Sequence, residues 1–153
     1  MDAGRLISAV NETFFLDSNI LVYLFDRDAP DKQRYVHELI ASHASQGRLI
    51  ISTQVLQEFY SVVTRKLAHP LFPEHALKAV QDFSVWPVIQ VDVPLILSGL
   101  VRHQTDKLSF WDSLIVEAAL TANVRELYSE DMHDGRVING MRITNPFKTR
   151  SRI

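Results

Sequence analysis

The sequence contains no cysteine, which excludes a disulfide framework and a metal site built from thiolates. This composition is compatible with a reducing compartment, and we expect the cytoplasm. The five glycines form neither a phosphate-binding loop nor a G-x-S-x-G turn. The six histidines include no two that are four residues apart, as H-E-x-x-H requires. Nucleotide-dependent enzymes, serine hydrolases and zinc hydrolases are therefore disfavoured.

Long apolar runs are also missing. The longest, VPLILSGLV at 93–101, has about half of the roughly 20 residues that a membrane-spanning helix needs. Residues 1–13 place charged side chains around a very short apolar patch, which is too little for a secretory signal. We expect an N-terminal arm over 1–13 and no contact with a membrane.

The sequence also has no excess of positive charge. It contains 16 Lys and Arg and 18 Asp and Glu, for a net charge of -2. A chain with this balance does not coat nucleic acid by electrostatics alone. Any contact with nucleic acid is therefore expected to be focal.

What is present is a pattern of short apolar runs separated by helical spacing in a chain long enough for one domain. The runs predict strands at 14–16, 49–52, 88–91, 126–129 and 141–144. Helices are expected at 31–46, 53–68, 73–85, 93–103 and 110–123, and in the run ILVYLF after Asn19. Alternation of strands and helices predicts an α/β fold with a mostly parallel central sheet of about five strands flanked by helices.

Asp17 directly follows the first predicted strand and precedes a predicted helix. The carboxyl ends of strands in open parallel sheets are where ligands bind, so Asp17 is a candidate site residue. The alternative interpretation is that Asp17 or Ser18 only caps the next helix, and the residue alone does not decide between them.

Two more acids are predicted to lie on apolar helix faces. Glu58 has Val55 and Val62 as helical neighbours, and Asp112 is followed by Ile115 and Val116 at the same spacing. Buried carboxylates are costly unless they find a cation, hydrogen-bond donors or a metal. The alternatives are a boundary position for Glu58 and, for Asp112, a capping box with Ser109 three residues earlier.

The fourth candidate is Asp131, which leaves the predicted strand at 126–129 much as Asp17 leaves the first. Its alternative interpretation is an ordinary loop acid. Four converging carboxylates without Lys or Arg would repel one another unless a multivalent cation lies among them. Oxygen ligands favour Mg²⁺ or Mn²⁺, and such ions activate water and neutralise phosphate oxygens in phosphodiester hydrolysis.

In order along the chain, FLDSNILVY, TQVLQEFYSVVTRK, LSFWDSLIVEAAL and LYSEDMHDGRVINGMRITNPF resemble the PIN-domain family, especially its VapC-type toxins. The resemblance covers 14–147 and leaves 148–153 as a basic C-terminal tail. It implies a PIN-like three-layer sandwich and a Mg²⁺- or Mn²⁺-dependent endoribonuclease, the toxin of a type II toxin–antitoxin pair. It also implies an RNA substrate, a cognate antitoxin as partner and a homodimer.

The same resemblance implies that Asp17, Glu58, Asp112 and Asp131 form an acidic catalytic pocket, with Asp17 and Asp112 the surest metal ligands. Glu58 and Asp131 would complete the site directly or through water. Small polar residues that support the acids are expected at Ser18, Asn19 and Ser129. Either Glu130 or Asp134 could take the place of Asp131, because both are its neighbours.

Basic residues near the predicted helix ends and in the tail are candidates for binding RNA phosphates, or they are ordinary solvated charges. They are Arg65, Lys66, Arg102, His103, Lys107, Lys148, Arg150 and Arg152. Trp111, next to Asp112, is expected to pack in the core rather than to stack on a base.

Two rival functions differ in class. In one, Asp17 is the nucleophile of a haloacid-dehalogenase-like phosphatase, whose D-x-D-x-T pattern is incomplete here because Asn19 stands where the second acid would be. In the other, the domain is a PIN-like binding module without turnover, against which the four intact acids argue.

Overall fold

The computed structural model describes residues 12–148. Most of the expected arm over 1–13 lies outside these residues. So does the expected tail beyond Lys148, with Arg150 and Arg152. Of the described helices, none is both long and apolar enough to cross a membrane.

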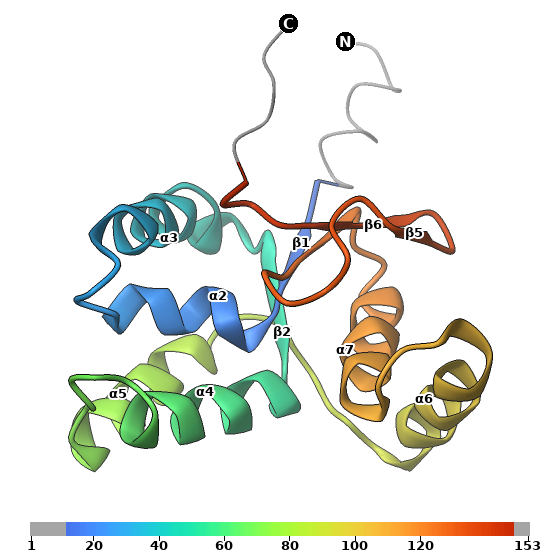
Figure 1. Cartoon of the computed structure of the whole chain (residues 1–153), viewed down its shortest axis with the longest axis horizontal. Helices are drawn as coiled ribbons and strands as arrows, with labels where there is room; N and C mark the ends of the chain where they lie inside the picture. The colour runs from blue at the N-terminus through green and yellow to red at the C-terminus, as the bar shows by residue number, and fades with distance from the viewer. Residues whose placement is uncertain (1–11, 149–153) are drawn as a thin grey trace, which may run out of the picture.

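The described chain forms an alternating series of strands and helices (Figure 1). In order, the elements are β1 (Phe14–Leu16), α2 (Ser18–Val22), the 3-10 helix η1 (Tyr23–Phe25), α3 (Pro30–His43), the 3-10 helix η2 (Ala44–Gln46), β2 (Leu49–Ser52), α4 (Thr53–Arg65), α5 (Pro73–Phe83), β3 (Val88–Ile89), α6 (Val93–Asp106), α7 (Phe110–Thr121), β4 (Glu126–Tyr128), β5 (Val137–Ile138) and β6 (Met141–Thr144).

The central sheet has the order β3-β2-β1-β4-β6-β5. Every neighbouring pair is parallel except β5 and β6. The expected α/β class with a mostly parallel sheet is confirmed, but the estimate of about five strands is corrected to six. The additional strand, β5, is joined to β6 by Asn139-Gly140, both with positive φ, as a tight hairpin requires.

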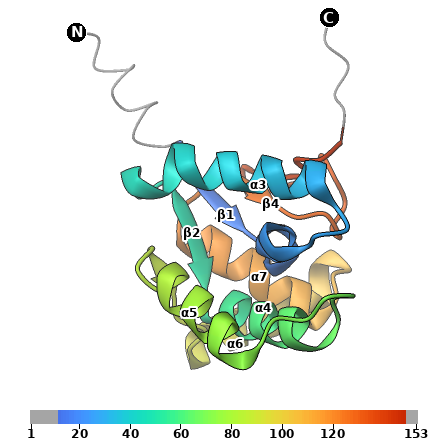
Figure 2. The same cartoon turned by 90° about the vertical axis from the view of Figure 1, so that its left-hand side faces the viewer.

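Helices cover the sheet in layers, as the resemblance implied. Figure 1 shows β1 and β2 between α2, α3, α4 and α5 on one side and α6 and α7 on the other, and Figure 2 views the first of these layers with α7 behind the strands. The strands are short, and β2, in the interior of the sheet, is buried at all of its residues. A strand covered on both faces has no solvent-facing row, which explains its continuous apolar sequence.

The sheet has its topological switch between β1 and β4. From β1 the chain continues outward to β2 and then β3, and only after α7 does it return to the other side of β1 as β4. In open α/β sheets the crevice at the carboxyl end of such a switch is where ligands bind. The fold therefore predicts a site beyond Leu16 and Tyr128, which are register partners.

Gly99 allows α6 and α7 to approach closely. A Cβ built on Gly99 would lie 2.7 Å from Cδ2 of Leu114, which is buried. We expect Gly99→Val to lower the free energy of unfolding by about 1–3 kcal/mol, because a branched side chain overfills this contact. Urea unfolding measures the change. Ser98→Val on the exposed side of α6 is the matched control, and equal loss in both variants would contradict the packing argument.

Candidate active site

Asp17 lies at the switch point of the sheet and is almost fully buried. Its backbone N–H donates to the carbonyl of Tyr128 on β4 at 3.0 Å. Its carboxylate caps α2 by accepting from the N–H of Ser18 at 2.8 Å, and it accepts from the hydroxyl of Ser129 at 2.8 Å. Asp17 therefore caps α2, as the alternative interpretation expected. Its carboxylate also faces Ser129, directly after β4, rather than solvent.

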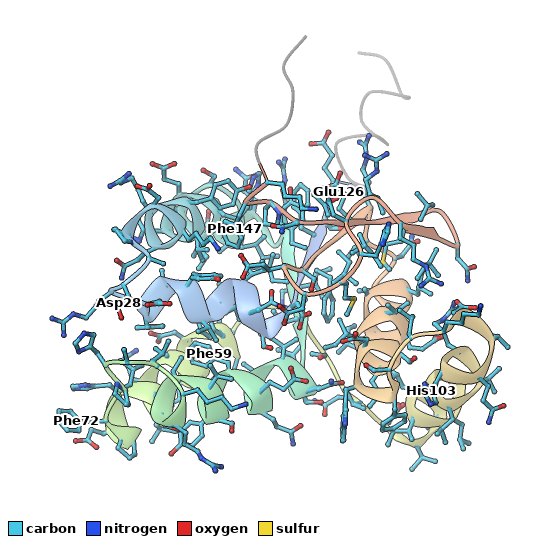
Figure 3. The ribbon with its side chains drawn as sticks, in the orientation of Figure 1. Asp28, Phe59, Phe72, His103, Glu126 and Phe147 are labelled. Atoms are coloured by element: carbon cyan, nitrogen blue, oxygen red, sulfur yellow. The ribbon has the colours of Figure 1, made fainter. Side chains whose placement is uncertain are left out.

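Glu58 is brought to the same region by α4. This helix begins after Ser52, whose hydroxyl caps it, and buries Val55 and Phe59 on its core face. The carboxylate of Glu58 accepts from Ser18 at 2.9 Å and from the side-chain amide of Gln54 at 2.7 Å. Figure 3 shows the next residue, Phe59, directed between α4 and α2, so Glu58 stands at the edge of the core.

Asp112 lies in the first turn of α7, partly buried. The Ser109 hydroxyl accepts from its backbone N–H at 3.0 Å, so Ser109 is the N-cap of α7, as the capping interpretation expected. Asp112 is also close enough to Asp17, Glu58 and Asp131 for their charges to interact. The two interpretations of Asp112 are therefore compatible.

Asn19 joins Asp131 to Asp17. Its side-chain N–H₂ lies 3.3 Å from Asp17 Oδ2, 3.1 Å from Asp131 Oδ2 and 3.4 Å from the Ser129 hydroxyl. Its Oδ1 accepts from the backbone N–H of Glu130 at 3.1 Å. One neutral amide thus fixes the chain where it leaves β4 and holds Asp131, which is otherwise exposed, beside Asp17.

The two alternatives to Asp131 are engaged elsewhere. Glu130 accepts from Lys32 at 2.6 Å and from the Tyr23 hydroxyl. Asp134 accepts from the backbone N–H of Asn145 at 2.7 Å. The geometry therefore favours Asp131 as the fourth acid.

The acids repel one another, and the charged form of two of them is disfavoured. Burial raises the pKa of Asp17 to about 7, opposed by the Ser129 hydrogen bond and reinforced by the charges of Glu58 and Asp112. Burial also raises the pKa of Asp112, opposed by Ser109 and reinforced by Asp131 and Glu58. Of the salt bridges within 12–148, none involves the four acids. The site has a deficit of positive charge.

Two of the four acids, Glu58 and Asp131, line a hollow of about 320 Å³. Its lining includes Ser18, Asn19, Glu58 and Asp131 from the expected set. It also includes Tyr23 and Asp26, which the sequence did not single out. Asp17 adjoins this hollow through Asn19, and the charge of Asp112 interacts with Asp17, Glu58 and Asp131, so acids from four separate stretches of chain lie near one another.

A divalent ion fits this donor set by its chemistry. The donors are carboxylate and hydroxyl oxygens, which suit hard ions such as Mg²⁺. Between residues 12 and 148, no three Asp, Glu or His side chains converge closely enough to hold one ion as they stand. Mg²⁺ is often held by only one or two carboxylates together with several waters, so its usual coordination does not need three converging acids.

The expected basic residues are scattered. Arg65 and Lys66 are exposed at the end of α4, about 10 Å along the helix from Glu58, and Lys107 is exposed at the end of α6. Lys148 is exposed and lies 3.9 Å from Asp134. His103, labelled on α6 in Figure 3, contacts the carbonyl of Leu108 through its ring.

Two expectations for individual residues need correction. Arg102 is mostly buried and forms ion pairs with Glu117 and Asp106, so it is engaged within the protein and does not present its charge to RNA phosphates. Trp111 is 63% exposed, so the expectation that it packs in the core is wrong. It lies in the first turn of α7, on the same helix face as Leu114, where both residues line an open hollow.

Sequence reasoning also missed three supporting residues. Gln54, which is buried, bonds to Glu58 and to the carbonyl of Trp111. Tyr23 and Lys32 hold Glu130 away from the other acids. Gln54 lies four residues before Glu58 on one helix face, and this spacing was an available signal. The pairing of Lys32 with Glu130 spans 98 residues and had none.

Comparison with known proteins gives one family and several similar structures. The PIN domain family matches residues 14–133. No curated protein matches the chain. The VapC20 toxin of Mycobacterium tuberculosis, described as cleaving the sarcin-ricin loop, is similar with a TM-score of 0.59 and 21% identity over 78% of this chain and 90% of the toxin.

Two complexes contain similar chains. One is a toxin–antitoxin complex from Klebsiella pneumoniae, with a TM-score of 0.66 and 18% identity over 90% of this chain and 100% of that chain. The other is a DNA-bound VapBC complex from Salmonella typhimurium, with a TM-score of 0.60 and 22% identity over 86% of this chain and 96% of that chain. At these identities the similarity concerns the fold.

Proposed function

This chain belongs to the PIN-domain family, and on that premise we propose that it is a Mg²⁺- or Mn²⁺-dependent endoribonuclease and the toxin of a type II toxin–antitoxin pair. The observation that carries the proposal is that Asp17, Glu58, Asp112 and Asp131 lie close enough for their charges to interact, with neutral hydrogen-bond donors between them. Glu58 and Asp131 line one hollow, and within 12–148 no salt bridge involves any of the four acids. Clustered acids without a compensating cation attract a metal ion.

The roles follow from burial and hydrogen bonding. Asp17 and Asp112 would hold the ion, and Glu58 and Asp131 would complete the site directly or through water. When bound, the ion supplies water activation and neutralisation of the phosphate oxygens. Ser129 and Ser18 orient Asp17 and Glu58 by donating hydrogen bonds to their carboxylates.

Asn19 keeps Asp17 and Asp131 at a fixed separation by donating to both. Before a cation binds, the raised pKa of Asp17 means that its carboxyl retains a proton near neutral pH. Binding of a cation releases that proton, because ligands must be deprotonated. The carboxyl of Asp17 would therefore act as a ligand only after a bound cation had displaced its proton.

The same charge deficit explains an antitoxin partner. A Lys or Arg from another protein can neutralise these carboxylates as a metal does, and so block the site. The similar structures from Klebsiella pneumoniae and Salmonella typhimurium are toxin–antitoxin complexes, which supports this partner class. We further propose a cytoplasmic homodimer, with single-stranded or looped RNA as substrate.

Removal of divalent ions gives the direct test of the proposal. We expect purified protein to cleave structured RNA with Mg²⁺ or Mn²⁺, to stop in excess EDTA, and to recover when the ion is restored. Gel analysis of a labelled RNA measures cleavage. The Asp17→Asn protein, purified in parallel, excludes a contaminating nuclease. Equal cutting by wild type in EDTA would refute the metal dependence, and no cutting under any condition would favour a binding module without turnover.

A further inference from the structure

A second hollow of about 320 Å³ adjoins the acid site between the start of α4 and the start of α7. Its lining includes Gln54, Phe110 and Trp111, together with the apolar Val91 and Ile96. Its volume is within the range of about 300–1,000 Å³ typical of small-ligand sites. Gln54 connects the two hollows, because its side chain bonds to Glu58 in the first and to the Trp111 carbonyl at the second.

Trp111 provides an exposed aromatic surface at this second hollow. Its side chain is 63% exposed, and Phe110 supports it in an edge contact with ring centroids 5.1 Å apart. An unpaired base stacks on such a ring without regard to sequence. Because Gln54 bonds to both Glu58 and the Trp111 carbonyl, a base stacked there would belong to a nucleotide near a phosphate held at the acids.

Gln54 adds a hydrogen-bonding group whose direction is fixed. Its Nε2 donates to Glu58 Oε1 at 2.7 Å and to the Trp111 carbonyl at 3.2 Å, which uses both amide hydrogens. The reverse orientation would set Oε1 against these two oxygens. Within residues 12–148, the buried Oε1 has no hydrogen-bond partner. A buried acceptor of this kind is satisfied by a ligand that brings a donor.

We infer that the second hollow binds one unpaired, amino-bearing base of the RNA substrate, stacked on Trp111 with its exocyclic amino group donating to Gln54 Oε1. The inference rests on the proposed function in taking RNA as the substrate. Cytosine fits this acceptor and uracil does not, because uracil presents a carbonyl oxygen where cytosine presents an amino group. The hollow thereby selects the nucleotide beside the cleaved bond.

Binding without cleavage tests the inference. The sequence has two tryptophans, so Trp86→Phe leaves Trp111 as the only indole fluorophore. In chelator, we expect short ribocytidylate to quench this fluorescence at lower concentration than ribouridylate. With labelled ribocytidylate followed by polarisation, Trp111→Leu should weaken binding about tenfold. Phe72→Leu, at an exposed aromatic labelled far from the site in Figure 3, is the control and should bind as wild type.

Gln54→Leu tests the selectivity separately from the stacking. We expect this variant to bind ribocytidylate and ribouridylate with equal affinity, provided that thermal melting shows it folded. Unchanged binding of ribocytidylate by Trp111→Leu would overturn the base site. A retained preference for ribocytidylate over ribouridylate in folded Gln54→Leu would overturn it too. Either result would favour contact of the exposed tryptophan with a protein partner. Intact selective binding with no cleavage in Mg²⁺ would instead refute the nuclease proposal alone.

Discussion

Asp17→Asn is expected to reduce RNA cleavage at least about a hundredfold while the protein remains folded. Residues that only orient metal ligands cost about 10- to 100-fold when removed, so loss of a proposed direct ligand should cost no less than the upper figure. The amide of Asn keeps the shape of the side chain and one oxygen to accept from Ser18 or Ser129. It lacks the charge that holds an ion.

Initial rates with labelled RNA in Mg²⁺ measure this effect, and thermal melting checks the fold. Asp31→Asn is the matched control, because Asp31 is an exposed acid at the start of α3, outside the hollow, and its loss should leave the rate unchanged. A full cleavage rate in Asp17→Asn would remove this residue from the site. A rate that falls only in proportion to a loss of folded protein would leave Asp17 with its capping role alone.

The second large effect is a loss of stability in metal-free protein as the pH rises. The pKa of Asp17 in the folded state is about 7, above its ordinary value of 3.8, so the folded state binds this proton more tightly than the unfolded state. The contribution of the Asp17 proton to the free energy of unfolding is therefore fully present below about pH 4, and most of it is lost by about pH 7. Between about pH 5 and about pH 8 the loss is roughly 3 kcal/mol.

Urea unfolding in chelator at the two pH values, for wild type and Asp17→Asn, measures this linkage. The wild type should lose roughly 3 kcal/mol more than the variant over that interval, and the variant should be the more stable of the two above neutral pH. Asp31→Asn should keep the wild-type dependence. If wild type and Asp17→Asn responded equally to pH, the carboxyl would have an ordinary pKa and the burial argument would be wrong.

The sequence predicted the sheet because its strands are buried on both faces and so appear as continuous apolar runs. It missed β5 because two residues, Val137 and Ile138, are too few to show a period. The Asn139-Gly140 pair that follows is nevertheless a strong hairpin signal. The helix ends were predicted less accurately. For example, α4 ends at Arg65 rather than near Ala68. Beyond Arg65 the chain turns, and the Leu71 N–H donates to the Val63 carbonyl.

The candidate acids were found because each is an exception to a local rule, a charge on an apolar helix face or at a buried strand end. Trp111 was misplaced because a large aromatic side chain suggests burial, whereas its exposure depends on which elements pack against the first turn of α7. The link from Gln54 to Trp111 and that from Lys32 to Glu130 depend on the packing of distant elements. No spacing in a single sequence encodes such contacts.

The pairing of β1 with β4 has a consequence for synthesis of the chain. Asp17 and its hydroxyl donor Ser129 are separated by 112 positions, and Asp131 follows still later. A ribosome that has translated only the first two-thirds of the message therefore carries a nascent polypeptide with Asp17 and Glu58 but without Asp112 and Asp131. Under the proposed function, an interrupted product would lack the nuclease site and would leave the RNA around it uncut.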